Sequence, residues 1–199
     1  MKKAFEITDN NIISNILNQA SYGTLALCVD NKPYCVPMNF VELNGDIYFH
    51  GAKKGKKIDM IQQNAYASFS VVEDYSLLPS YFSTDDGSAC PATHLFKSVI
   101  IDGVINFIDD YDEKADALQA LMVKLQQEGG FKHLSDDMYK KAINATELFK
   151  LIPDEKKAKF KFGQNFNQER YERVTTHLKQ RGTKKDLETL KLIDELRYR

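Results

Sequence analysis

The dipeptide Asn44-Gly45 constrains the fold more than any other feature of the sequence. It separates two apolar segments, residues 34–43 (YCVPMNFVEL) and residues 46–50 (DIYFH). Asn-Gly favours the positive φ angles of the tight turn that matches the twist of paired antiparallel strands. The two segments are therefore predicted to form a β-hairpin. Hairpins and short spacings between strands favour an antiparallel barrel over a doubly wound parallel sheet.

The rest of the pattern predicts a mainly β protein with peripheral helices. Apolar or alternating runs indicate further strands at residues 23–29, 65–72, 94–108, 146–152 and 157–162. Helical periodicity and capping signals indicate helices near residues 9–22, 56–64, 109–130 and 167–199. The expected barrel therefore has about six or seven strands, with helices at the ends of the chain and in its middle.

Two segments depart from regular structure. Pro37 lies inside an apolar segment and cannot donate to a strand ladder. It indicates an edge strand, a bulge, or a backbone that another group approaches. Residues 73–93 are rich in Ser, Asp, Pro and Gly and are predicted to form a long connection. A loop of that length in a compact domain is usually functional or disordered.

The C-terminal region is predicted to be a helical extension. Residues 1–165 would form the barrel, and residues 166–199 would form two amphipathic helices divided at Gly182. Thr183 and Asp186 have the spacing of a capping box at the start of the second helix. That helix carries an apolar stripe, which is expected to pack on the barrel or on a partner subunit. The stripe consists of Leu187, Leu190, Ile193 (or Leu192) and Leu196.

Charge and composition exclude several classes of protein. The formal net charge is −1 and the pI is about 6.4, without the basic excess of a general nucleic-acid or anionic-membrane binder. The three cysteines form no C-x-x-C pair and no cluster with metal-binding spacing, so free thiols and no metal site are expected. Neither a secretory signal nor an apolar run of about 18 residues is present, which predicts a cytoplasmic protein.

Four lysines follow the strand at residues 46–50, at the expected start of the next helix. They lie at positions 53, 54, 56 and 57. Cations oppose the helix dipole at this end, whereas free N–H groups there favour an anion. Gly51 and Gly55 let the backbone approach a ligand closely. Either this is a solvated charge run, or it is an anion site. The glycine spacing does not fit a phosphate-binding Walker loop, and no dinucleotide fingerprint occurs.

Histidine suggests further chemistry at two places. His50 immediately precedes the lysine loop, where it is either a structural histidine or a group that donates a hydrogen bond or a proton to a bound ligand. Cys90 and His94 suggest a nucleophile and its base, but no feature of the sequence fixes their geometry.

Four segments together resemble one known family. They are residues 34–40 (YCVPMNF), 44–61 (NGDIYFHGAKKGKKIDMI), 90–103 (CPATHLFKSVIIDG) and 159–182 (KFKFGQNFNQERYERVTTHLKQRG). In this order they resemble the pyridoxamine-5′-phosphate-oxidase-like family of FMN-binding split barrels, closest to its nitroimidazole-reductase-related branch. The resemblance covers residues 10–185. It implies a homodimer of six-stranded split barrels with FMN in grooves at the subunit interface.

The resemblance also implies which residues form the site. Lys56 and Lys57 stand where the family grips the FMN phosphate, and His50 matches a histidine near the reactive face of the flavin. The implied cofactor-binding residues are Val36, Pro37, Met38, Asn39, Phe49, His50, Lys56, Lys57 and Ser98, with His50 as the catalytic candidate. True pyridoxamine-phosphate oxidases carry basic residues where this chain has Tyr34 and Asn39, and no R-x-H lies near the C-terminus. Oxidation of vitamin B6 is therefore not expected.

The implied function is an FMN-dependent oxidoreductase. It would transfer electrons from NADH or NADPH to a small acceptor such as a nitro-aromatic compound or a quinone, with His50 protonating or orienting the substrate. Three alternatives stay open: a non-catalytic flavin-binding or redox-sensing protein, a haem-binding split barrel, and a ligand-binding module without flavin whose lysines are merely solvated. A fold alone does not decide between them.

Overall fold

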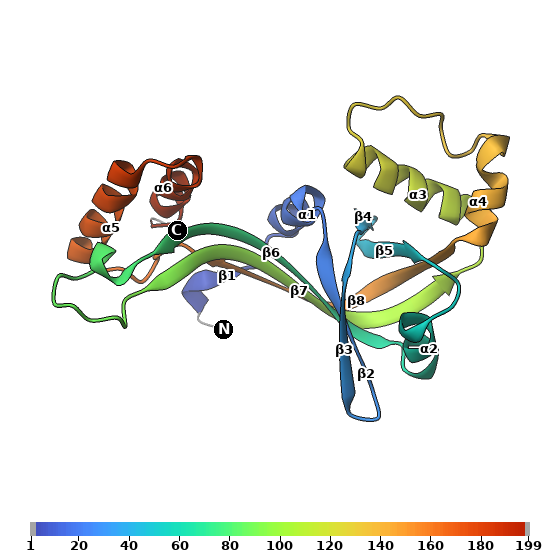
Figure 1. The fold of residues 1–199 in the computed structure, drawn as a ribbon, viewed down its shortest axis with the longest axis horizontal. Helices are drawn as coiled ribbons and strands as arrows, with labels where there is room; N and C mark the ends of the chain where they lie inside the picture. Colours follow the sequence, from blue (N-terminus) through green and yellow to red (C-terminus); the bar gives the residue numbers. More distant parts are fainter. Residues whose placement is uncertain (1–2, 198–199) are drawn as a thin grey trace. The chain divides into compact units, whose positions relative to one another are not determined.

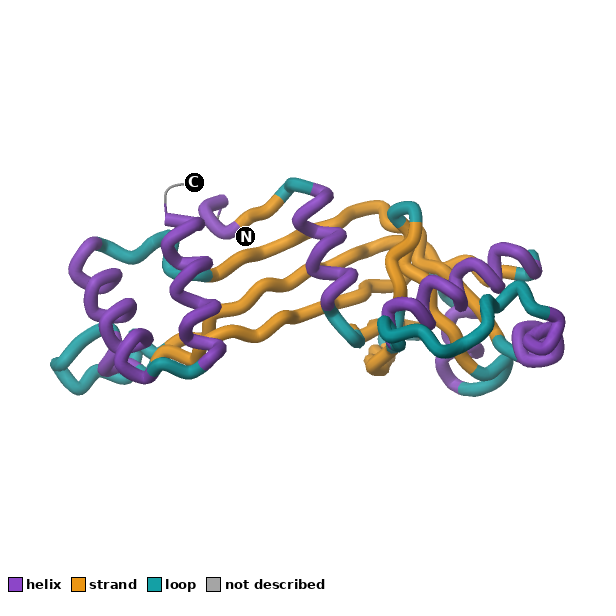
Figure 2. Tube along the Cα trace, turned by 90° about the horizontal axis from the view of Figure 1, so that it is seen from above, coloured by secondary structure: helices purple, strands orange, loops and turns teal. Residues whose placement is uncertain are grey.

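A computed structural model describes residues 3–197 (Figures 1 and 2), and it divides the chain into two compact units. The larger unit comprises residues 9–71 and 99–157. The smaller unit comprises residues 72–98, residues 158 onward and the N-terminal segment up to residue 8. The strands β6 (Tyr66–Leu78), β7 (Thr93–Ile108) and β8 (Glu147–Lys161) contribute residues to both units.

The strands form an open antiparallel sheet, as expected of a split barrel. Their order is β3-β2-β6-β7-β8-β5-β4, and β1 pairs with β8. The remaining strands are β1 (Glu6–Ile7), β2 (Gly23–Val29), β3 (Lys32–Met38), β4 (Val41–Leu43) and β5 (Asp46–Gly51). The predicted fold class is confirmed, but residues 3–197 form eight strands rather than six. One reason is that residues 34–43 form two strands, β3 and β4, where the sequence pattern predicts one.

Two tight hairpins in the larger unit follow from turn chemistry. Asn44 and Gly45 have φ angles of 55° and 92° and join β4 to β5, which confirms the predicted turn. Asp30 and Asn31 have φ angles of 50° and 59° and join β2 to β3. Asn and Asp tolerate this left-handed region better than other residues with a side chain. Both hairpins are therefore encoded by local residues.

The core of the larger unit is aromatic. The ring of Phe69 packs edge-on against Phe40 and Phe49, with centroid distances of 4.8 Å and 5.0 Å. Phe49 also stacks on Phe149 at 5.4 Å, and all four side chains are fully buried. Aromatic pairs in these geometries add stability beyond the area they bury. The cluster joins four segments and fixes the position of β5.

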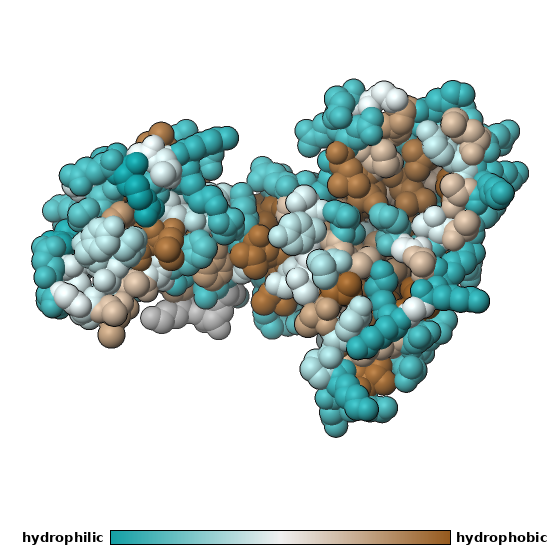
Figure 3. All heavy atoms as spheres, in the orientation of Figure 1, coloured by the Kyte–Doolittle hydropathy of each residue, from teal (hydrophilic) through white to brown (hydrophobic). Residues whose placement is uncertain are grey.

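Helices cover this core. The larger unit contains α1 (Asn10–Gln19), α2 (Lys56–Gln63), α3 (Tyr111–Leu125), η3 (Asp137–Tyr139) and α4 (Lys140–Ala145). Asp9 caps α1, accepting hydrogen bonds from the N–H groups of Asn11 and Ile12. Apolar side chains gather around α3 (Figure 3), where Leu121 packs with Tyr48 of β5 and Leu148 of β8. Figure 1 shows α3 and α4 near β5.

The smaller unit contains η1 (Lys3–Phe5), η2 (Ser80–Phe82), α5 (Gln168–Arg181) and α6 (Lys184–Arg197). The capping box predicted at Thr183 is present: Asp186 N donates to Thr183 Oγ1, and Thr183 N donates to Asp186 Oδ2. On α6, Leu190, Ile193 and Leu196 are buried, but Leu187 is 51% exposed and does not join the predicted stripe. Separation of residues 166–199 as an extension stays a prediction.

Two segments differ from the sequence prediction. Residues 73–78 continue β6, so the long connection begins only after Leu78 and includes η2. Residues 147–161 form the single strand β8, where the pattern predicts two shorter strands. Among residues 3–197, no helix combines the length and apolar character needed to cross a membrane.

Candidate functional site

The lysine loop ends at the N-terminus of α2, and Gly55 forms that terminus. Gly55 has a φ of 124°, a conformation that residues with side chains rarely adopt, and no side chain caps the helix. A Cβ at Gly55 would meet no atom within 4 Å, so the space beside this residue is open. The uncapped N–H groups and the helix dipole together favour an anion at this point.

Lys57 is the most informative side chain of this site. Its Nζ lies 3.2 Å from Met38 Sδ and 5.3 Å from the centroid of the Phe149 ring. The side chain also lies against Gly51, because a Cβ there would be 3.0 Å from Nζ. Burial lowers the pKa of the Lys57 ammonium. Within residues 3–197, no carboxylate forms a salt bridge with it.

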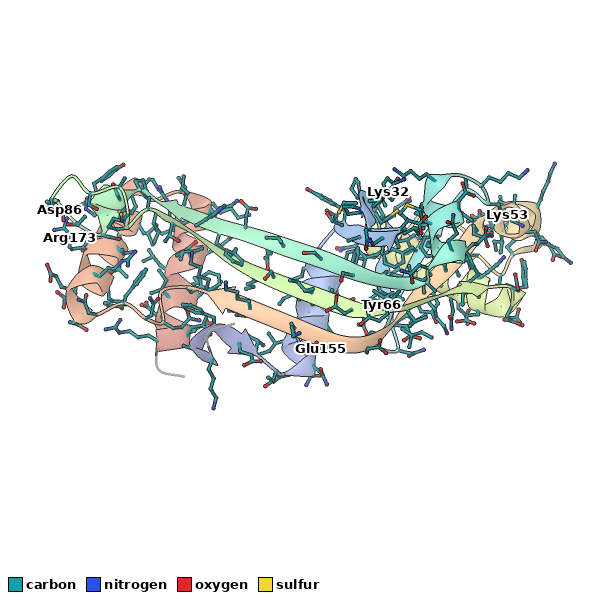
Figure 4. The ribbon with its side chains drawn as sticks, turned by 90° about the horizontal axis from the view of Figure 1, so that it is seen from below. Lys32, Lys53, Tyr66, Asp86, Glu155 and Arg173 are labelled. Atoms are coloured by element: carbon teal, nitrogen blue, oxygen red, sulfur yellow. The ribbon has the colours of Figure 1, made fainter. Side chains whose placement is uncertain are left out.

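The other three lysines of the loop are exposed. Lys56 Nζ lies 4.5 Å from the centroid of the Tyr34 ring, a cation–π contact that directs it toward β3. Figure 4 labels Lys53 on the loop before α2. The side chains of the two lysines that begin α2 therefore extend in different directions. Lys56 extends toward Tyr34 of β3, and Lys57 extends toward Phe149 of the aromatic core. A phosphate group would fit this helix terminus, because the terminus offers one half-buried ammonium, one exposed ammonium and free N–H groups.

The strand β3 lies at one edge of the sheet, paired with β2 only. Its outer backbone edge is therefore free to bind another molecule, which explains why Pro37 is tolerated. Val36 is half-buried, Pro37 is exposed and Met38 is buried. Asn39 follows the strand, and its side chain donates a hydrogen bond to Ser21 O. Of these three strand residues, Met38 contacts the lysine loop, through the Lys57 ammonium.

Phe49 and His50 are neighbours on β5 and lie on opposite faces of that strand. The Phe49 side chain is enclosed in the aromatic core, and its backbone is in register with Phe149 of β8. His50 is half-buried, and its Nδ1 is buried without a hydrogen-bond partner. Burial, and then the charge of Lys57, lower the pKa of the His50 imidazole. His50 is therefore neutral at pH 7, with an unsatisfied polar atom in the site.

The remaining predicted residues lie in the smaller unit. Ser98 is buried on β7, and its contact with a flavin stays a prediction. His94 Nε2 hydrogen-bonds to Tyr75 O, whereas Cys90 is an exposed free thiol. The hydrogen bond to Tyr75 gives His94 a structural role that does not involve Cys90.

The structure adds residues that the sequence pattern does not single out. Tyr34 supplies the ring beneath Lys56, and Phe149 supplies the ring beside Lys57. Phe149 lies far along the chain from the lysine loop, so no local pattern connects the two. The sequence marks Tyr34 only as a departure from the family that the four segments resemble, and its contact with Lys56 is visible only in the structure.

Comparisons with known proteins concern the family and the fold. A family model described as pyridoxamine 5′-phosphate oxidase matches residues 9–160. A candidate 5-nitroimidazole antibiotic resistance protein from Bacteroides thetaiotaomicron is similar in structure, with a TM-score of 0.62 and 24% identity over 77% of this chain and 85% of that one. The flavocytochrome Anf3 from Azotobacter vinelandii gives a TM-score of 0.67 and 20% identity over 86% and 78% of the two chains.

A third similar structure is the FAD and haem binding protein from Mycobacterium smegmatis. It gives a TM-score of 0.66 and 20% identity over 79% of this chain and 74% of that one. A search of curated protein sequences finds no significant match. At these identities the structural likeness concerns the fold.

Proposed function

This chain belongs to the pyridoxamine 5′-phosphate oxidase family, and we propose that it is an FMN-dependent oxidoreductase. In this proposal it transfers electrons from NADH or NADPH to a small acceptor such as a nitro-aromatic compound or a quinone. The observation that carries it is Lys57, a half-buried ammonium without a carboxylate partner among the described residues, at an uncapped helix N-terminus. Burying part of a charged group costs free energy unless an opposite charge pairs with it, so a half-buried ammonium without a carboxylate partner favours a bound anion.

Each part of the site has a separate role in this proposal. Lys56, Lys57 and the first N–H groups of α2 hold the phosphate, and the free edge of β3 holds the ring. FMN, when bound, supplies the electron-transfer chemistry. The lowered pKa of His50 leaves little imidazolium at pH 7, which favours orienting a substrate by a hydrogen bond over protonating it.

Flavin titration tests the phosphate assignment. We expect FMN to bind at least about tenfold more tightly than riboflavin, because a charge-assisted hydrogen bond contributes about 1.5–3 kcal/mol. Lys57→Met keeps the apolar packing against Phe149 and removes the charge, so most of this preference should disappear. Lys54→Met, in the same loop but exposed, is the matched control and should leave it intact.

The absorption spectrum of the purified protein discriminates the alternatives. A flavin spectrum with NADH or NADPH oxidation by an added acceptor supports the oxidoreductase, and a flavin spectrum without turnover supports a carrier or sensor. Equal affinity for FMN and riboflavin would exclude Lys57 as the phosphate ligand. A Soret band without flavin binding would replace the proposal by a haem protein.

We further propose a homodimer with FMN at the subunit interface. In the larger unit, Tyr66, Ile100 and Val104 point away from the core on β6 and β7, while their strand neighbours are buried. Ser68 donates a hydrogen bond to Asp102 on this outward face of the two strands. Figure 4 labels Tyr66 at the start of β6. An apolar sheet face of this kind is typical of a protein–protein interface.

Sedimentation velocity tests the dimer. The wild type should sediment at twice the chain mass of 22.8 kDa. Ile100→Glu places a charge in the proposed interface and should shift the population to monomer, with weaker FMN binding. Val123→Glu, at an exposed apolar position on α3, should stay dimeric. A monomeric wild type at micromolar concentration would contradict the proposal.

A further inference from the structure

Three half-buried cations of the smaller unit lie close together: Lys159 and Lys161 on β8, and Arg170 on α5. The Nζ atoms of the two lysines lie 5.3 Å and 5.8 Å from the centroid of the Phe96 ring on β7. The charges of Lys159 and Arg170 both act on Lys161. Within residues 3–197, none of the three cations forms a salt bridge. These three residues form the basic cluster of this unit.

The basic cluster is a row at the ends of two neighbouring strands. Lys159 and Lys161 are two residues apart on β8, so their side chains lie on one face, with Cα atoms about 7 Å apart. Lys161 ends β8 and donates a hydrogen bond to Thr93, the first residue of β7. Arg170 Nη2 donates to the carbonyl of Pro91, which precedes β7. Lys161 is therefore the middle cation of the row.

Hydrogen bonds fix the basic cluster without using most of its donors. Arg170 Nε donates to Ser83 Oγ at 3.1 Å, in addition to the hydrogen bond from Nη2. A guanidinium has five donors and an ammonium has three, so most donors of Arg170 and Lys161 have no acceptor among residues 3–197. Glu6 of β1 is in register with Lys159 but forms no salt bridge with it. A bound anion would satisfy these donors.

Three like charges at one place cost free energy. Burial, and then the charges of Lys159 and Arg170, lower the pKa of the Lys161 ammonium, and burial lowers the pKa of the Arg170 guanidinium. Lys97 of β7 shows the contrast. It also lies over two aromatic rings, at 4.9 Å and 5.4 Å, but the Glu73 carboxylate pairs with it. A charge that leaves water is stabilised by an opposite charge, and among residues 3–197 no carboxylate supplies one to the basic cluster.

We propose that the basic cluster binds the diphosphate group of a small organic molecule. A row of three cations suits an anion that is longer than one phosphate group and carries oxygen atoms at both ends. Arginine binds a phosphate group through two parallel hydrogen bonds, whereas lysine binds it as a point charge. Arg170 therefore holds one phosphate group, and the two lysines hold the other. The cluster lies in the smaller unit and the lysine loop in the larger one, so the inference does not rest on the proposed function.

Calorimetry with inorganic pyrophosphate on the full chain tests the inference. At about 150 mM NaCl, exposed charges are screened beyond about 8 Å, so general attraction to the surface contributes little. We expect pyrophosphate to bind at least about tenfold more tightly than orthophosphate, because the second phosphate group adds a charge-assisted hydrogen bond. Equal affinity for the two anions, or no binding of pyrophosphate, would overturn the inference.

Three variants make the test specific. Lys161→Met keeps the apolar stem beside Phe96 and removes the charge, so it should weaken pyrophosphate binding at least about tenfold. Lys97→Met, also half-buried over aromatic rings of this unit, is the matched control and should bind as the wild type does. Lys57→Met, in the larger unit, should keep the tight pyrophosphate site. Equal weakening in Lys161→Met and Lys97→Met would overturn the inference.

Two further measurements do not depend on the affinity of a variant. In the wild type, the ¹⁵N resonances of the Arg170 guanidinium should shift on titration with pyrophosphate, and unchanged resonances would overturn the inference even if every variant failed to fold. Without any anion, Lys161→Met should be at least as stable as the wild type in urea, because it removes a like charge from the cluster. A lower stability of Lys161→Met together with unchanged pyrophosphate affinity would show a merely structural lysine.

Nucleotides separate the two sources of a diphosphate group. Binding of ADP that depends on Lys161 identifies a free nucleoside diphosphate, whereas binding of FAD but not ADP identifies a flavin dinucleotide, and either result supports the inference. If pyrophosphate binds and FMN does not, the proposed oxidoreductase alone fails. If FMN binds and pyrophosphate does not, the basic cluster alone fails. Loss of FMN binding in Lys161→Met but not in Lys57→Met would overturn the inference, because the cluster would then hold the single phosphate of FMN.

Discussion

Asp186→Asn is expected to lower the free energy of unfolding by about 3 kcal/mol, the cost of removing one partner from a buried ion pair. Asp186 is fully buried near the start of α6, and its carboxylate accepts hydrogen bonds from Arg181 Nε at 2.8 Å and Nη2 at 2.5 Å. The asparagine would leave the Arg181 charge unpaired. We take the low end of the usual range because the Arg181 side chain is 34% exposed.

The same carboxylate joins three segments of the smaller unit. Ser76 Oγ of β6 donates to it at 2.5 Å, and Thr183 Oγ1 donates at 2.7 Å. Arg181 Nη1 also donates to Leu77 O, so the pair holds α5, α6 and β6 together. Asparagine can accept only part of this set, since one of its oxygens is replaced by a donor. The loss should therefore be cooperative rather than confined to one hydrogen bond.

The pH dependence gives an independent measurement. The hydrogen bond from Arg181 is the largest cause that lowers the pKa of Asp186 below its ordinary value. A carboxyl whose pKa is lower in the folded state contributes stability above its unfolded pKa of about 4 and loses it as pH falls through its folded pKa. In urea unfolding, the difference between wild type and Asp186→Asn should be full at pH 7 and smaller at pH 3.

Asp85→Asn is the matched control. Asp85 also pairs with an arginine, Arg173, through two hydrogen bonds, but its side chain is 79% exposed. Figure 4 labels Arg173 close to Asp86, the residue that follows Asp85. Exposed pairs contribute little, so no measurable change in stability is expected. Equal losses in the two variants would contradict the role of burial at Asp186.

Local chemistry explains which parts of the fold the sequence predicts well. The turns at Asn44-Gly45 and Gly182 and the capping box at Thr183 depend on residues close together in the chain. The extension of β6 is missed because Glu73 and Asp74 are polar. The structure pairs them with Lys97 and Lys185, partners that only the tertiary fold supplies.

The same distinction applies to the candidate site. Gly55 and the lysines adjoin a predicted helix start, so an anion site can be inferred from the loop alone. The burial of Lys57 against Phe149 cannot be inferred from the loop, because almost a hundred residues separate the two in the chain. The apolar pocket lined by His50, α3 and residues 131–139 is also beyond local patterns, because its walls come from segments far apart in the chain.

Gly103→Ala is expected to destabilise the protein by about 3 kcal/mol, at the upper end for overpacking. A Cβ at Gly103 would lie 2.1 Å from Ile152 O and 3.0 Å from Pro153 Cα. These are backbone atoms of β8, so no side-chain rotation relieves the clash. Gly103 has no left-handed φ, and the whole effect is steric. Urea unfolding at pH 7 measures it.

Gly87→Ala separates this clash from backbone strain. Gly87 has a φ of 76° and open space where a Cβ would lie, so its substitution costs only the left-handed conformation, about 1 kcal/mol. A loss at Gly103 no larger than that at Gly87 would mean that β7 and β8 do not approach this closely. The approach matters for the site because β8 also carries Phe149, against which Lys57 lies. If FMN binds there, saturating FMN should raise the unfolding midpoint of Gly103→Ala as well as that of the wild type, since a ligand stabilises the folded state it binds.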